Sequence, residues 1–100
     1  MFDRSGLNGL HWCARRNYPE IMLELLKVGC FVDSRDYFGR TPLFIAARSN
    51  NLECLRELII HKADPWLKTT AGKLPVNVAI GYAAERILER SMLLSVMSRM

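Results

Sequence analysis

The chain has 100 residues, of which 50% are hydrophobic and 24% charged, with a net charge of +4. This length allows one domain, residues 1–100, and the composition supports a packed core rather than disorder. Because the chain has no long uncharged apolar run and no charged-then-apolar leader, we expect neither a membrane span nor a secretory signal.

The first predicted unit covers residues 3–34. Asn8 can cap a helix, although Gly9 is a poor helix starter. A second helix follows, and Gly29 suits its C-terminal cap. Its apolar stripe has the spacing of one helix face and consists of Ile21, Met22, Leu25 and Leu26.

The second unit covers residues 36–67 and has stronger helix signals. Thr41 is a natural N-cap, and Pro42 suits the first helical turn, where a missing N–H costs nothing. Lys62 stands where Gly29 stands in the first unit, so we expect a left-handed residue without glycine there.

The third unit, residues 69–92, has Leu74 in place of the capping threonine and a weakly marked turn at residues 81–84. No Gly or Pro follows Ala84, so we expect the last helix to continue toward residue 97, with a helical extension over 93–100.

The three units share a 33-residue period, as Gly6, Gly39 and Gly72 illustrate. Together with the Thr-Pro-Leu-x-x-Ala-Ala pattern that begins at Thr41, this period resembles the ankyrin repeat. The resemblance implies an all-α solenoid of three repeats, each a β-turn and two antiparallel helices. It also implies a non-catalytic protein-interaction module or scaffold rather than an enzyme.

Ankyrin-like proteins bind through their finger tips and the exposed side of the first helices, on the concave face. Basic and aromatic residues fill these positions here and no acid does, whereas six glutamates fall on the second helices. The resemblance therefore implies a partner with an acidic surface or peptide; solvated charge is the alternative reading. The candidate binding residues are Arg4, Arg15, Arg16, Arg35, Tyr37, Phe38, Arg40, Arg48, Lys68, Lys73 and Tyr82.

The C-terminal segment carries more apolar residues than its repeat needs. Since a terminal repeat should have a polar outer face, we expect Leu94, Val96 and Met97 to dock on a neighbouring chain or further parent sequence. The chain is then a fragment or a docked subunit of a larger assembly. The alternative function is an accessory domain of a larger enzyme or channel whose activity lies outside this chain.

Three cysteines, Cys13, Cys30 and Cys54, lack paired spacing and cannot all pair with one another. We expect reduced thiols, with Cys30 and Cys54 buried, and an intracellular, cytoplasmic location that leaves nuclear or cytoskeletal association open. His11 lies near Cys13, but four convergent ligands are missing. We therefore expect no metal, cofactor or catalytic residue, and no nucleic-acid or membrane partner, because no basic run or nucleic-acid motif occurs.

Overall fold

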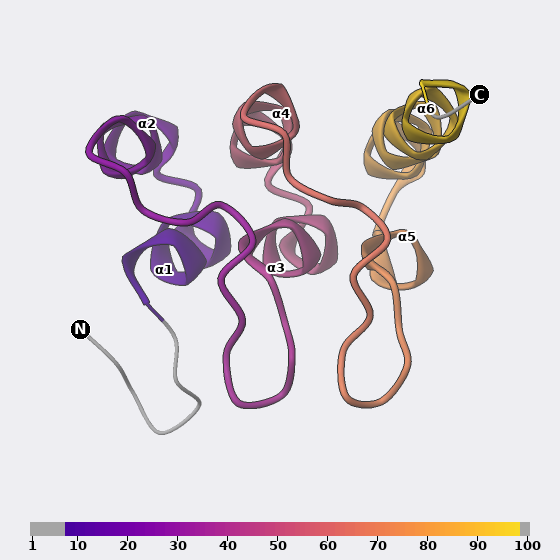
Figure 1. Cartoon of the computed structure of the whole chain (residues 1–100), viewed down its shortest axis with the longest axis horizontal. Coiled ribbons are helices and arrows are strands. Elements are labelled where there is room, and N and C mark those ends of the chain that lie inside the picture. The colour runs from indigo at the N-terminus through magenta and orange to yellow at the C-terminus, as the bar shows by residue number, and fades with distance from the viewer. Residues whose placement is uncertain (1–7, 99–100) are drawn as a thin grey trace.

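A computed structural model describes residues 8–98 of the chain. Its helices form three pairs that stand side by side in one row (Figure 1). No strand occurs within residues 8–98, and the all-helical arrangement confirms the predicted solenoid. The helices are α1 (Gly9–Arg16), α2 (Pro19–Lys27), α3 (Pro42–Ser49), α4 (Leu52–Ile60), α5 (Pro75–Val78) and α6 (Tyr82–Met97).

Side-chain caps at the start and left-handed asparagines at the end define the first helix in the first two repeats. Asn8 accepts a hydrogen bond from the His11 N–H at the start of α1, and Thr41 accepts one from the Phe44 N–H at the start of α3. Each helix then ends at an asparagine in the left-handed conformation, Asn17 at φ 60° and Asn50 at φ 57°. These caps explain why α1 and α3 both have eight residues.

The second helices carry most of the predicted apolar stripe into the core, but Ile21, which we placed in that stripe, is 55% exposed. Met22, Leu55 and Leu88 occupy the same register in the three repeats and are all fully buried. Helix α3 lies at the centre of the row, and every residue from Pro42 to Ala47 is buried. Lys62 has φ 70°, which confirms the left-handed residue predicted after α4.

The third repeat differs from the predicted pattern because α5 has only four residues. Leu74 offers no side-chain oxygen for a cap, and Ala83 stands in the register of Asn17 and Asn50. Alanine disfavours the left-handed conformation, so the chain turns earlier, at Gly81 with φ 88°.

This early turn corrects the placement of Tyr82. We predicted Tyr82 on the exposed side of the first helix of the third repeat, but it is the first residue of α6. At the other end, α6 continues through Ser95, the residue that replaces Gly29 and Lys62 in this register. With no left-handed stop there, the helix runs to Met97.

Two loops extend from the helix layer on the side of α1, α3 and α5 and lie next to each other (Figure 1). We call them finger 2 (residues 33–41) and finger 3 (residues 66–74). The Asp36 carboxylate closes finger 2 by accepting hydrogen bonds from the Phe38 and Arg40 N–H groups at 2.9 and 2.8 Å. It also accepts a 2.5 Å bond from Arg40 Nε. Finger 2 is therefore held in shape by one buried carboxylate.

The carbonyl groups of finger 2 connect it to the repeats on both sides. The Phe38 carbonyl accepts hydrogen bonds from the N–H and the hydroxyl of Thr70 in finger 3, at 3.0 and 3.1 Å. The Arg40 carbonyl lies 2.8 Å from His11 Nε2 in α1. All three repeats are thus joined through finger 2.

Gly39 makes the close approach of the two fingers possible. Its φ is +74°, and a Cβ there would lie 2.9 Å from the Thr70 nitrogen. Gly72 has a similar φ of +79° in finger 3, but a Cβ there would meet nothing within 4 Å. The two glycines share one backbone conformation and differ in crowding.

We predict that Gly39→Ala destabilises the chain more than Gly72→Ala does. Both variants place a side chain in the left-handed region, at a cost of about 1–2 kcal/mol, but only Gly39→Ala pushes finger 3 away. Urea unfolding gives the two free energies of unfolding when both variants are analysed with the same dependence of free energy on urea concentration. Equal losses would contradict a tight contact between the fingers.

His11 is fully buried. Its Nε2 donates a hydrogen bond to the Arg40 carbonyl, and its Nδ1 lies 3.2 Å from the Asn8 backbone nitrogen and 2.9 Å from Asn8 Oδ1. Burial lowers the pKa of His11 below its ordinary 6.5, against the opposite influence of the Arg40 carbonyl and the Asp36 charge. The folded protein therefore holds this ring neutral.

The free energy of unfolding should consequently fall as the pH drops below about 6.5. In that range the unfolded chain binds a proton at His11 and the folded chain does not, so protonation favours unfolding. Urea unfolding at about pH 7.5 and 5.5 measures the loss. His11→Gln, which cannot titrate, should reduce this dependence; an unchanged slope would assign it to other groups.

Candidate protein-interaction surface

The structure brings most of the predicted binding residues to the side formed by α1, α3 and the two fingers. Arg15 and Arg16 end α1, and Arg48 lies in the last turn of α3. Arg35 and Tyr37 belong to finger 2 and are exposed, and Lys68 is exposed in finger 3. Arg4 lies outside the described residues.

In the first repeat, two guanidinium groups lie close to the ring of Trp12. The Cζ atoms of Arg15 and Arg16 lie 5.3 and 5.4 Å from its ring centroid, within the range of cation–π contact. The indole N–H is buried and finds no hydrogen-bond partner within the described part of the chain. Trp12 also packs against the core, so it holds both arginines close to the helix.

Arg40 is much less available than the sequence suggested. Its side chain is only 18% exposed and is bound to Asp36, whose side chain is 0% exposed. The guanidinium also lies 5.1 Å from the ring centroid of Phe38. Arg40 therefore serves mainly to neutralise Asp36 and to support Phe38, which is itself 54% exposed.

Between the fingers and α3 lies a hollow of about 190 Å³, which we call the basic-aromatic groove. Phe44 and Arg48 face it from α3, as expected for residues four apart on a helix. The Arg48 Cζ lies 5.9 Å from the centroid of Phe44. The lining is Phe38, Arg40, Phe44, Arg48, Thr69, Thr70, Ala71 and Lys73.

This groove has positive charge and no acidic lining residue. Within residues 8–98 the ion pairs are Lys27 with Glu24 and Arg40 with Asp36, which leaves Arg48 and Lys73 outside any pair there. Desolvation lowers the pKa of Arg48, and the positive charges of Arg40 and Arg15 lower it further. Arg48 stays cationic at neutral pH, and a bound anion would stabilise its positive charge.

Tyr82 does not join this surface through the third repeat's first helix. It opens α6, where Arg86 donates a hydrogen bond to its hydroxyl and lies 5.4 Å from its ring centroid. The short α5 thus removes the third repeat's predicted aromatic contribution to the first-helix side.

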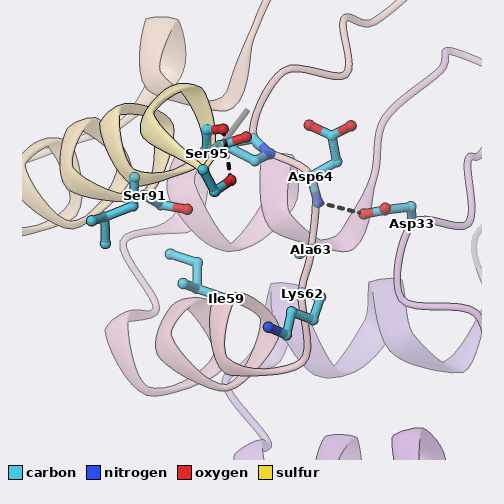
Figure 2. Close-up of a pocket in the computed structure, with 10 residues that line it drawn as sticks. Asp33, Ile59, Lys62, Ala63, Asp64, Ser91 and Ser95 are labelled. Carbon is cyan, nitrogen blue, oxygen red and sulfur yellow. Dashed lines mark hydrogen bonds between the residues drawn. The ribbon is translucent and has the colours of Figure 1, made fainter. Parts of the chain in front are cut away.

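A second, larger hollow of about 600 Å³ lies between α4 and the C-terminal half of α6 (Figure 2). Leu94 lines it, and Leu94, Val96 and Met97 are all exposed. At its far end the Asp33 carboxylate accepts a hydrogen bond from the Asp64 N–H at 3.0 Å. The docking role of Leu94, Val96 and Met97 stays a prediction.

One substitution in the repeat pattern explains this second hollow. Ser91 occupies the register of Leu25 and Leu58, and Leu58 is fully buried between the first two repeats. A serine fills less of the space between α4 and α6 than a leucine would. Sequence reasoning missed this feature, although alignment of the three repeats contains the signal.

The thiols differ in exposure. Cys13 and Cys54 are buried, and burial raises both pKa values, that of Cys54 to about 12. Cys30 is exposed, which corrects our expectation of a buried thiol. It lies in a loop whose neighbours Gly29 and Phe31 are also exposed, whereas Ala63, in the same register, is buried.

We predict that iodoacetamide modifies Cys30 in the folded chain and leaves Cys13 and Cys54 intact, because only an accessible thiolate reacts. Mass spectrometry should find one adduct in buffer and three in denaturant. Cys30→Ser is the control and should remain unmodified when folded. Rapid alkylation of Cys54 in that variant would contradict its burial.

The remaining chemistry of the described residues is limited. Within residues 8–98, no group of three or more His, Cys, Asp or Glu side chains could hold a metal ion. The helices of the same region include none that is long and apolar enough to cross a membrane. The surface features that remain are the fingers, the basic-aromatic groove and the exposed part of α6.

Three stacked helix pairs with fingers on one side define a repeat protein of the solenoid class. A family model described as ankyrin repeats, in three copies, matches residues 2–89. The chain belongs to the ankyrin-repeat family, which confirms the resemblance found in the sequence.

Similar proteins include a kinase, a phosphatase regulatory subunit and another ankyrin-repeat protein. The chain is 32% identical over 78 residues to Tyrosine-protein kinase Shark of Drosophila melanogaster, covering 77% of this chain and 8% of that protein. It is 33% identical over 86 residues to mouse Protein phosphatase 1 regulatory subunit 12A, covering 82% of this chain and 8% of that protein. It is 40% identical over 58 residues to Ankyrin repeat domain-containing protein 29 of Danio rerio, covering 57% and 20%. The chain thus spans less than a tenth of the first two relatives. Ankyrin repeats are protein–protein interaction modules, and this chain is one of them.

Proposed function

We propose that this chain is a non-catalytic intracellular scaffold module that binds an acidic protein surface or peptide through its concave side. The supporting observation is a set of cations on one side that form no ion pair within residues 8–98, namely Arg15, Arg16, Arg35, Arg48 and Lys73. Aromatic rings lie among them, and such rings and arginines are enriched at binding hot spots.

The opposite charge gathers on the second helices. Glu20, Glu24 and Glu53 are exposed on α2 and α4, and Glu85 and Glu89 are exposed on α6. The same helices also carry the exposed cations Lys27, Arg56, Arg86 and Arg90, so their net charge is close to neutral. An acidic partner is therefore attracted more strongly to the finger side than to the outer helices, and this difference orients the encounter.

Selection of peptides from a random display library against the folded chain tests this proposal. The recovered peptides should be enriched in Asp and Glu and depleted of Lys and Arg. Association of a selected peptide should slow when Arg15→Glu and Arg16→Glu are combined, and raised salt should weaken it. Arg40 is unsuitable for reversal, because its loss leaves the buried Asp36 charge unpaired.

The matched control combines Arg56→Glu and Arg90→Glu, which make the same change in net charge at exposed positions of α4 and α6. This control should leave binding nearly unchanged. If it abolishes binding while the α1 reversals do not, the outer helices form the interface and the proposed face is wrong.

The alternative proposal is an accessory ankyrin domain of a larger enzyme or channel. The match to a short part of Tyrosine-protein kinase Shark favours it, because this chain corresponds to only 8% of that protein. In that case the same surface would contact the remainder of the parent protein.

A further inference from the structure

We propose that the basic-aromatic groove binds the phosphate group of a phosphorylated serine or threonine in the partner. This inference rests on the proposed function and deepens it. It places one phosphorylated side chain of the partner in this groove, so that partner binding depends on phosphorylation.

The groove is built by three separate parts of the chain whose relative position is fixed. Finger 2 contributes Phe38, α3 contributes Arg48 and finger 3 contributes Lys73. The Thr70 N–H bond to the Phe38 carbonyl joins the fingers, and the Asp36 carboxylate holds finger 2 in shape. A site whose walls are already in place loses little conformational freedom on binding.

The charge of the lining suits a dianion better than a single carboxylate. Three cations line the groove, but Arg40 is neutralised by Asp36, so Arg48 and Lys73 leave a balance of two positive charges. A phosphorylated side chain carries nearly two negative charges at neutral pH and has three acceptor oxygens. Arg48 offers a planar set of N–H donors and Lys73 a compact ammonium group, which are complementary means of holding phosphate.

Two further features fit a phosphate on a protein side chain. Phe38 and Phe44 give the groove an apolar wall for the stem that carries the phosphate. The Thr69 oxygen accepts the Lys73 N–H at 3.2 Å, and its hydroxyl hydrogen remains available to donate. The 190 Å³ hollow is of the size of one side chain rather than of a folded surface.

Nuclear magnetic resonance titration of the isotope-labelled chain provides the test. The probes are N-acetyl-phosphothreonine methylamide, N-acetyl-glutamate methylamide and inorganic phosphate, compared at constant ionic strength. The phosphothreonine probe should bind at least about fivefold more tightly than the glutamate probe, because it makes more charge-assisted hydrogen bonds. Its largest shifts should fall on the Arg48 side chain and on Phe38, Thr70 and Lys73.

Arg48→Gln and Lys73→Gln should each weaken this binding about tenfold, as expected for the loss of a charged hydrogen bond. Arg56→Gln is the matched control, because Arg56 is an exposed arginine of α4 that lies outside the groove and outside the proposed binding side. It should leave the affinity unchanged. The dispersion of the amide spectrum verifies that each variant is folded.

Equal affinity for the phosphothreonine and glutamate probes would overturn the phosphate assignment. Unchanged binding in Arg48→Gln, or equal loss in Arg56→Gln, would overturn its location. Inorganic phosphate binding as tightly as phosphothreonine would show a free-anion site instead. None of these results affects the preference for acidic peptides measured with the α1 reversals, so failure of this inference is distinct from failure of the proposed function.

Discussion

The three repeats depend on one buried carboxylate. Asp36 closes finger 2 through two backbone N–H groups and Arg40, and this closure presents the Phe38 and Arg40 carbonyls to opposite neighbours. One carbonyl meets finger 3 and the other meets His11 of α1. Since a buried carboxylate needs its partners, the charge of Arg40 is largely committed to structure. The proposed binding side therefore takes its shape from Asp36 and its free charge from Arg48, Lys73 and the arginines of α1.

Much of the fold could be predicted because the same sequence signals occur at equivalent positions in more than one repeat. Thr41 and Asn8 occupy equivalent capping positions, and the stripe of Met22, Leu55 and Leu88 predicts the buried side of every second helix. The left-handed Lys62 followed from the position of Gly29 one repeat earlier. In each case the cause lies within a few residues of the chain, where sequence spacing is informative.

The wrong predictions are of two kinds. Some concern residues whose surroundings are formed by another repeat, and others concern positions where the expected sequence signal is missing. The short α5 reflects the loss of a left-handed asparagine at Ala83, because α5 begins in the same register as α3 and differs at its C-terminal end. Cys30 is exposed although its register suggested burial, because coverage is decided by tertiary contacts. The spacing of Asp36 and Arg40 did not reveal that their pairing removes one arginine from the surface, nor could it show that Arg48 and Lys73 line one hollow.

Because Ser91 is smaller than the leucines in its register, the two interfaces between repeats are not packed equally. In a linear array each repeat is stabilised by its own folding and by contact with its neighbours, so cooperativity passes through the interfaces one at a time. The first interface is filled by Leu58 and bridged by Asn51, whose side-chain amide donates to the Ala14 and Arg15 carbonyls. At the second, Ser91 and Ala84 replace these residues. We therefore expect native-state opening to begin at the third repeat, with the first two repeats as the more persistent cooperative unit.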